Sequence, residues 1–257
     1  YKRQGQIYGF LGPNGAGKST TMNIITGYLA STEGEVLING HNILEEPEEA
    51  KKCIGYLPEL PPVYTDMTVL EYLKFVAELK KIPKDQRKKQ ILEVMNLVKI
   101  TDMQNRLIKN LSKGYRQRVG LAQAILGYPE VIILDEPTAS LNEDDSKALL
   151  DLLLKFKKQG MTSIIISHKL NEISYVADKI TVIRDGSTIE TLDKKKDDFS
   201  EQRIIQGMVG REMTDRFPKR PNVKIGDVSM EIKNWNVYHP LYTERKVVNN
   251  VSFKVHK

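Results

Sequence analysis

Hydrophobic residues along this chain follow two periods, and segments of the two kinds alternate. Short apolar runs, typical of buried strands, lie at 6–11, 53–59, 131–136 and 162–167. Apolar residues at helical spacing predict helices at 18–29, 70–79, 84–98, 112–126, 144–159 and 170–178. Strands as apolar as these are typical of a parallel sheet that helices cover on both faces. The pattern therefore predicts an α/β fold.

Two hairpins and a helical block interrupt this alternation. The hairpins span 34–43 and 179–191, and they turn at Asn39-Gly40 and Asp185-Gly186. Both dipeptides are strong hairpin signals because their residues tolerate positive φ. Three helices follow one another within 65–126, which predicts a helical subdomain inserted between strands of the sheet.

The chain divides into a main domain, a connector and a final pair of strands. Residues 1–191 contain the alternating strands and helices. Residues 192–227 are charged and include Pro218 and Pro221, which predicts a connector with one helix near 200–209. Residues 228–257 return to the alternation that is typical of strands.

Composition narrows the function classes only slightly. The chain has 257 residues, of which 40% are hydrophobic and 28% charged, as in soluble globular proteins. No apolar run approaches the roughly 20 residues that a membrane-spanning helix needs. The single cysteine, Cys53, excludes an internal disulfide and suits a reducing compartment. The net charge of +6 comes from scattered lysines, which favours a solvated surface, and no nucleic acid partner is expected.

A glycine-rich segment carries the clearest chemical signal. The sequence GPNGAGKST fits the phosphate-loop pattern G-x-x-x-x-G-K-[ST], with a strand before it and a helix after it. Glycines let successive backbone N–H groups face one anion, and the helix N-terminus adds its positive end. Lys18 is expected to reach the terminal phosphates and Ser19 to bind Mg²⁺. The candidate phosphate-binding residues are Gly12, Pro13, Asn14, Gly15, Ala16, Gly17, Lys18, Ser19 and Thr20.

An acidic pair follows the apolar strand VIILDE. The strand should carry Asp135 to the carboxyl edge of the sheet, where ligands of open parallel sheets bind, so Asp135 can hold Mg²⁺. Glu136 can polarise the water that attacks the terminal phosphate. By itself an Asp-Glu pair at a strand end is a weak signal, but together with the phosphate loop it indicates nucleotide hydrolysis.

A third segment, LSKGYRQR, begins the last helix of the helical block. Ser112 is expected to cap this helix and Gly114 to leave backbone N–H groups open to an anion. Two interpretations follow from the residues alone: the helix end clamps a phosphate bound to a second molecule, or Ser112 is only a cap.

Taken in order, the phosphate loop, YLPE, LSKGYRQR, VIILDEPTASL and IIISHK resemble the ATP-binding subunits of ABC transporters over nearly the whole chain. The resemblance implies a P-loop NTPase fold of the ABC type, with a mainly parallel core, an antiparallel β-subdomain and a helical subdomain. It implies ATP and Mg²⁺ as cofactors, and a head-to-tail dimer with a second copy or a homologous cassette. It also implies a transmembrane permease as partner, and a place at the cytoplasmic face of the membrane.

The resemblance assigns roles to individual residues. Glu59 stands where the family usually has a glutamine that contacts Mg²⁺ and senses the transport partner. Ser112 and Gly114 belong to the signature, Asp135 binds the metal, Glu136 is the general base, and His168 contacts the terminal phosphate. Departures from the family pattern are Glu59 itself, Lys113 and Tyr115 in the signature, and Asn142, where Asp is usual. The last departure predicts weak cooperation between the two sites.

The resemblance changes along the chain. Residues 1 to about 126 resemble exporter subunits, whereas about 135–257 resemble the ATPases of monosaccharide importers. This change suggests a hybrid joined near 126–135, and the alternative is a natural protein of intermediate character. Residues 228–257 resemble the opening strands of a cassette. We expect them to complete the sheet before residue 1, by docking beside Gln6–Gly9 of the same chain or, as a swap, on a neighbour. Tyr238 or Tyr242 would then stack on adenine.

The leading hypothesis is therefore an ATP-hydrolysing subunit that couples closure of a dimer to membrane transport. Two alternatives are an ABC ATPase that acts on the ribosome or on DNA, and a folded but inactive hybrid or permuted chain. The sequence shows neither the coiled-coil insertion nor the basic linker that the first alternative needs.

Overall fold

A computed structural model describes residues 5–210 and 226–256 of the chain. The chain separates into two compact units, Tyr1–Met213 and Thr214–Lys257. Within the described ranges, no helix combines the length and the apolar character needed to cross a membrane.

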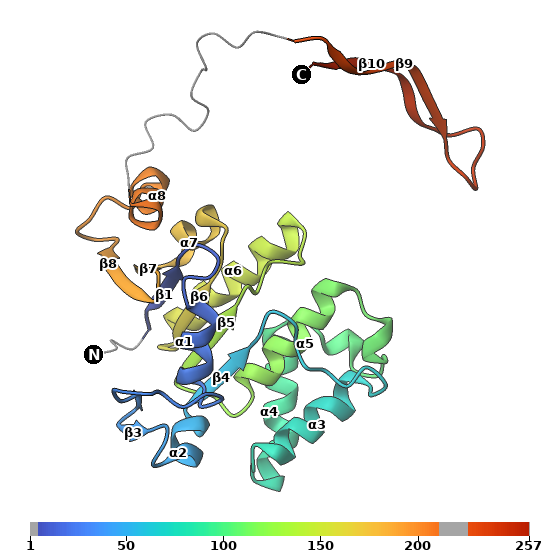
Figure 1. Cartoon of the computed structure of the whole chain (residues 1–257). Helices are drawn as coiled ribbons and strands as arrows, with labels where there is room; N and C mark the ends of the chain where they lie inside the picture. The colour runs from blue at the N-terminus through green and yellow to red at the C-terminus, as the bar shows by residue number, and fades with distance from the viewer. Residues whose placement is uncertain (1–4, 211–225, 257) are drawn as a thin grey trace. The chain divides into compact units, whose positions relative to one another are not determined.

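A six-stranded sheet forms the centre of the first unit (Figure 1). Its strands, in spatial order, are β4 (Ile54–Leu57), β5 (Val131–Asp135), β6 (Thr162–Ile166), β1 (Ile7–Leu11), β7 (Lys179–Arg184) and β8 (Ser187–Asp193). The first five are parallel, and β8 pairs antiparallel with β7 through the predicted Asp185-Gly186 turn. The predicted α/β fold with a mainly parallel core is confirmed, and the strand order brings the ends of β1, β5 and β6 to one edge.

Helices cover both faces of this sheet because alternate strand residues point to opposite sides. Ile7 and Leu11 of β1 belong to the large buried core on one face. The helices α5 (Lys113–Ile125), α6 (Glu143–Lys158), α7 (Leu170–Val176) and α8 (Glu201–Val209) contribute to that core. On the other face, Phe10 packs in a smaller cluster around Met22 of α1 (Lys18–Ile25).

The helical block predicted for 65–126 is present beside the sheet (Figure 1). It consists of α3 (Val69–Leu79), α4 (Lys84–Leu97), two short 3₁₀ turns (Thr101–Met103 and Ile108–Asn110) and α5. Thr68 and Glu71 form a reciprocal capping box at the start of α3. Lys80 then ties α3 to the end of α5, because its ammonium donates hydrogen bonds to the carbonyls of Gln123 at 2.8 Å and Leu126 at 2.6 Å.

The β2–β3 hairpin and two helices differ in detail from the prediction. The hairpin predicted for 34–43 contains only β2 (Leu37–Ile38) and β3 (His41–Asn42). α1 ends at Ile25 because Gly27 adopts a left-handed φ of 70°, and the N–H groups of Gly27 and Tyr28 donate to the carbonyls of Ile24 at 3.1 Å and Asn23 at 2.8 Å. The short, charged α2 (Pro47–Lys52) was not predicted, because it has too few apolar residues to show a period.

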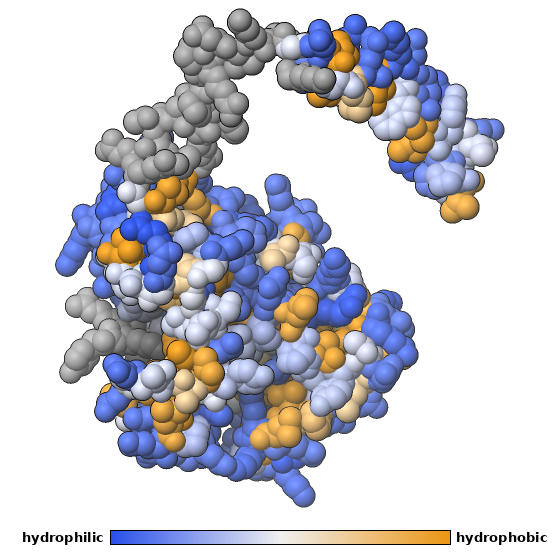
Figure 2. Space-filling model, viewed as in Figure 1, coloured by the Kyte–Doolittle hydropathy of each residue, from blue (hydrophilic) through white to orange (hydrophobic). Residues whose placement is uncertain are grey.

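The second unit is an antiparallel pair, β9 (Val228–Tyr238) and β10 (Lys246–His256). Its strand residues are mostly exposed, and Figure 2 shows hydrophobic side chains along its surface. In the first unit, β1 already has hydrogen-bonded neighbours on both sides, β6 and β7, so it offers no free edge to strands 246–256. Completion of the sheet before residue 1 by residues 228–257, on the same chain or on a neighbour, stays a prediction, as do the domain limits at 191 and 227.

Candidate nucleotide site

Residues 12–17 form a loop between β1 and α1, and Lys18, Ser19 and Thr20 form the first turn of α1. Gly15 and Gly17 have φ angles of 81° and 98°, a left-handed conformation that side chains other than glycine rarely adopt. A Cβ atom added at Gly15 meets no described atom within 4 Å, so the loop is open at this position. Gly17 immediately precedes α1, whose N-terminal N–H groups lack partners within the helix. The backbone is therefore shaped to receive an anion.

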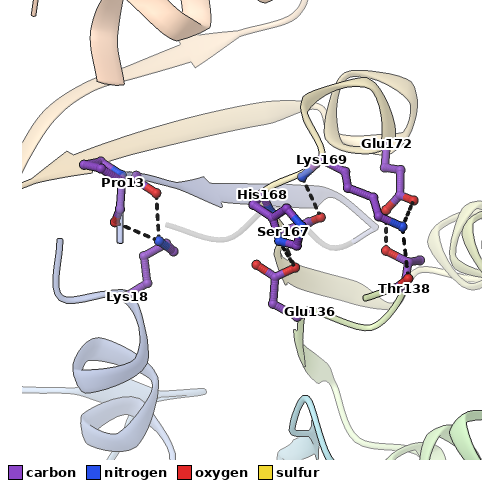
Figure 3. Close-up of polar contacts among 9 residues, drawn as sticks. Pro13, Lys18, Glu136, Thr138, Ser167, His168, Lys169 and Glu172 are labelled. Carbon is purple, nitrogen blue, oxygen red and sulfur yellow. Dashed lines mark hydrogen bonds and ion pairs between the residues drawn. The ribbon is translucent and has the colours of Figure 1, made fainter. Parts of the chain in front are cut away.

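Two contacts hold this loop in place. The backbone N–H of Gly186, in the β7–β8 turn, donates to the carbonyl of Ala16 at 3.1 Å. The ammonium of Lys18 folds back on the loop and donates to the carbonyls of Gly12 at 2.7 Å and Pro13 at 3.0 Å (Figure 3). These carbonyls keep a cation beside the open N–H groups, where it can exchange its partners for phosphate oxygens.

A cavity of about 390 Å³ lies at the carboxyl edge of the sheet, next to the loop. It brings together the loop and the acidic residues that the sequence singled out from distant segments. The lining residues are Asn14, Gly15, Gly17, Lys18, Ser19, Thr20, Glu59, Asp135, Glu136 and Ile166.

Three of the lining residues are carboxylates. Burial raises the pKa of Asp135 above its usual range, and the negative charges of Glu136 and Glu59 raise it further, against the opposing effect of Lys18. An excess of negative charge at this position favours a bound cation. Within residues 5–210 and 226–256, no group of three or more His, Cys, Asp or Glu side chains could by itself hold a metal. Mg²⁺ is usually bound by one or two protein carboxylates together with phosphates and water, and Asp135 offers such a carboxylate in this cavity.

Glu136 and His168 meet beside this cavity. Glu136 follows β5 with an unusual φ of 45°, and its backbone N–H donates to the carbonyl of Ile166 at 2.9 Å. Its Oε2 lies 2.9 Å from Nδ1 of His168 (Figure 3). The Glu136 side chain is only 15% exposed, whereas that of His168 is 65% exposed. The histidine ring can therefore reach a ligand while the carboxylate is held close to the sheet.

A second polar cluster, which sequence reasoning missed, lies behind this pair. Lys169 donates to the carbonyl of Thr138 at 3.0 Å and to Oε1 of Glu172 at 3.1 Å, while the Thr138 hydroxyl donates to the other oxygen of Glu172 (Figure 3). Thr138 is fully buried and Glu172 nearly so. The only available signal was the Lys-x-x-Glu spacing of 169 and 172, which is too common to single out a site.

Comparisons with known proteins agree with this geometry. Residues 2–139, more than half of the chain, match the family model described as ABC transporter. The chain belongs to the ABC transporter family. It is 41% identical over 267 residues to the L-arabinose transport ATP-binding protein AraG of Geobacillus stearothermophilus, covering 99% of this chain and 51% of that protein. It is 36% identical over 274 residues to the xylose import ATP-binding protein XylG of Thermoanaerobacter pseudethanolicus, with the same coverage of 99% and 51%.

The ABC fold is also shared with solved structures. The dimeric, post-hydrolysis structure of an ATP-binding cassette bound to ADP and Pi has a TM-score of 0.67 and 26% identity, covering 75% of this chain and 87% of that one. The chain spans about half the length of the curated relatives it matches. Since the match to AraG covers 99% of the chain, it includes residues 126–135, where the sequence suggested a hybrid junction.

The signature segment of this ABC cassette lies at the start of α5. The Ser112 hydroxyl accepts a hydrogen bond from the Tyr115 N–H at 3.3 Å, so Ser112 caps the helix. A Cβ at Gly114 would lie 2.7 Å from a carboxylate oxygen of Asp145 in α6, so a larger residue here would require the Asp145 side chain to move. Of the described residues, those lining the cavity do not include Ser112 or Gly114. Whether these two residues act on a nucleotide in a facing cassette stays a prediction.

Two other positions raised by the sequence have structural contexts of their own. Asn142 caps α6 by accepting a hydrogen bond from the Asp145 N–H at 2.8 Å, a role that Asp performs equally well. In the second unit, the Tyr238 ring lies 5.6 Å from the ammonium of Lys246, and the Tyr242 ring packs 5.2 Å from that of His239. Both tyrosines are at least half exposed. Stacking of either on adenine stays a prediction.

Proposed function

We propose that this chain binds MgATP in the cavity beside the phosphate loop and hydrolyses it. The observation that carries the proposal is the convergence on one cavity of the loop, Asp135 and Glu136, which come from separate parts of the sequence. Membership of the ABC family supports the same activity.

The binding residues have distinct tasks. The open N–H groups of residues 15–20 surround the phosphates, and the Lys18 ammonium pairs with the terminal ones. Mg²⁺, when bound, neutralises the charge that develops on the phosphate oxygens. Ser19 and Asp135 hold the metal ion, and Glu59 lies on the same cavity wall, where it can orient a water of the metal shell.

The chemical step is assigned to Glu136 and His168. The Glu136 carboxylate takes a proton from the water that attacks the terminal phosphate in line with the leaving group. His168 lies 2.9 Å from Glu136 through Nδ1 and is largely exposed, so its ring can contact the same phosphate through the other nitrogen. Lys18 stabilises the charge that moves to the leaving group.

A second cassette completes the site in this proposal. Ser112 and Gly114 present a helix N-terminus and act on the nucleotide of a facing copy or homologous cassette. The dimeric state of the solved cassette bound to ADP and Pi supports this arrangement. Tyr238 or Tyr242 supplies the aromatic surface for adenine.

Transport is the proposed use of this cycle. The relatives AraG and XylG carry names that refer to L-arabinose transport and xylose import. We therefore propose that the chain works at the cytoplasmic face of a membrane, on a transmembrane permease, and that the cargo is a monosaccharide.

Size-exclusion chromatography of Glu136→Gln, with and without MgATP, tests the proposal. Without hydrolysis the closed dimer should persist, so the variant should elute as a dimer with MgATP and as a monomer without it. Glu136→Gln combined with Lys18→Ala is the control, and it should remain monomeric in both conditions. Elution that does not respond to millimolar MgATP, together with equal ATP turnover by wild type and Glu136→Gln, would exclude the assigned roles.

A further inference from the structure

We propose that Lys169 and Glu172 are positioning residues that hold the Glu136–His168 pair in its working geometry. Together with Thr138 they form a cluster, here called the loop clasp, that joins the loop after β5 to the start of α7. This inference rests on the proposed function of the same site, and it assigns residues that the family resemblance did not.

The position of the loop clasp suggests its role. Thr138 lies two residues after Glu136, and Lys169 lies one residue after His168. Each loop therefore carries one member of the Glu136–His168 pair and one anchor of the clasp. The backbone N–H of Lys169 is also fixed, because it donates to the hydroxyl of the buried Ser167 at 3.1 Å. Movement of one loop against the other would therefore disturb the clasp and the Glu136–His168 contact together.

The hydrogen bonds of the loop clasp favour one arrangement of the two loops. The Lys169 ammonium has two acceptors, the Thr138 carbonyl at 3.0 Å and Glu172 at 3.1 Å, and Glu172 also accepts from the Thr138 hydroxyl. Glu172 is 8% exposed. Removing one partner from a buried charged pair leaves the other charge without compensation, so the loops should rearrange to reach solvent.

A small rearrangement here should affect hydrolysis strongly. Glu136 must hold its carboxylate within hydrogen-bond reach of the attacking water, and its φ of 45° shows that the backbone is already in an uncommon conformation. Misplacement by about 1 Å can reduce the rate of a positioned reaction by about 100-fold. ATP binding depends mainly on the phosphate loop, so it should change little.

Steady-state ATP hydrolysis by Lys169→Met tests the inference. We expect kcat to fall by about 100-fold while KM for ATP stays within about threefold of wild type. Lys169→Arg keeps the charge and should recover most of the lost turnover. Thr138→Val removes only the hydroxyl donor and is the milder variant to use if Lys169→Met does not fold.

Lys157→Met is the matched control. Lys157 forms an ion pair with Asp178 at 2.5 Å, and its side chain is 30% exposed, against 31% for Lys169. That pair lies at the amino end of β1, where Asp178 also accepts from the Ile7 N–H. Lys157→Met should therefore lose thermal stability without the selective loss of kcat.

Hydrogen exchange of backbone amides separates the clasp from the proposed function. In Lys169→Met, amides of residues 136–141 and 167–172 should exchange faster than in Lys157→Met, whether or not the chain hydrolyses ATP. Unchanged exchange in these segments, or a kcat of folded Lys169→Met within twofold of wild type, overturns the inference. Equal turnover by wild type and Glu136→Gln would instead count against the proposed function. The hydrogen-exchange result would then decide by itself whether the loop clasp holds the two loops.

Discussion

The nucleotide site has two sides that are built in different ways. The phosphate-loop side, residues 12–20, is made mainly of backbone: positive φ angles, open N–H groups and one lysine held by loop carbonyls. The opposite side, after β5 and β6, is made of side chains: the Glu136–His168 contact and the loop clasp behind it. In the proposed function, binding thus depends on the shape of the backbone, whereas the chemical step depends on where a few side chains are held.

This difference implies that the two functions can be lost separately. A change on the loop side should weaken ATP binding and leave the Glu136–His168 geometry intact. A change on the opposite side should lower turnover and leave binding intact. Asp135 is linked to both sides, since Lys18 on one side lowers its pKa and Glu136 on the other raises it.

The largest effect on binding should come from Lys18→Ala. In the proposed function the ammonium donates charge-assisted hydrogen bonds to the terminal phosphates, so its loss should weaken MgATP binding by at least about 100-fold. Titration with a fluorescent ATP analogue measures this change. Lys51→Ala, an exposed lysine away from the cavity, is the control. Wild-type affinity in Lys18→Ala would show that the cavity binds its ligand in another way.

Glu136→Gln should impair only the chemical step, which depends on the opposite side of the site. The amide keeps the size of the side chain but cannot take a proton, so kcat should fall by about 1000-fold while the Kd for MgATP stays the same. Single-turnover hydrolysis and nucleotide titration of one preparation give both values. If the two fall together, the separation between binding and chemistry is wrong.

Gly12→Ala tests how far backbone packing supports the loop side. A Cβ at this position would lie 2.3 Å from the backbone carbonyl oxygen of Ile183 in β7, which cannot move without disturbing the sheet. We expect a loss of about 3 kcal/mol in the free energy of unfolding, measured by urea denaturation. Gly15→Ala is the comparison, because it adds strain from φ but no clash, and it should lose about 1 kcal/mol. A loss in Gly12→Ala no larger than that in Gly15→Ala would show that the sheet relaxes around the added Cβ and that packing at Gly12 is not tight.

The two sides of the site also differ in how well they could be predicted from the sequence. The loop side was predictable because its glycines, lysine and serine are contiguous, and the strand and helix around them show clear periods. Asp135 was predictable because a buried strand fixes where its last residue points. In contrast, the clasp joins Thr138 to Lys169 and Glu172 across 31 and 34 positions, and hydrophobic periodicity carries no record of such pairs.

Other parts of the fold show the same limit. The strands were predicted well because apolar runs define them, whereas α2 was missed because six charged or small residues give no period. Gly114 was interpreted as an opening for an anion, yet the structure adds a packing reason, the approach of Asp145 from α6. Contacts between distant segments decide such cases, and one sequence does not reveal them.

Asp135→Asn should produce the smallest effect. It tests the residue that is linked to both sides of the site. In the unfolded chain the pKa of Asp135 is near 3.8, and in the folded protein burial, Glu136 and Glu59 raise it. The ionised carboxylate therefore costs stability: the cost is absent below pH 3.8 and appears as the pH rises through the raised pKa. At pH 7 without nucleotide, Asp135→Asn should raise the free energy of unfolding by no more than about 1 kcal/mol, because solvent screens part of the interaction.

The stability gained in Asp135→Asn should disappear at acid pH, and it should become a loss of stability when MgATP is present. Thermal unfolding at pH 7 and pH 4, with and without MgATP, measures all four states of the comparison. At pH 4 the two proteins should unfold at more similar temperatures, and with MgATP at pH 7 the wild type should be the more stable one, because only its carboxylate pairs with the metal ion. If Asp135→Asn is less stable than wild type at pH 7 without nucleotide, then the ionised Asp135 stabilises the fold. Repulsion among the carboxylates at the carboxyl edge would then not lower the free energy of unfolding.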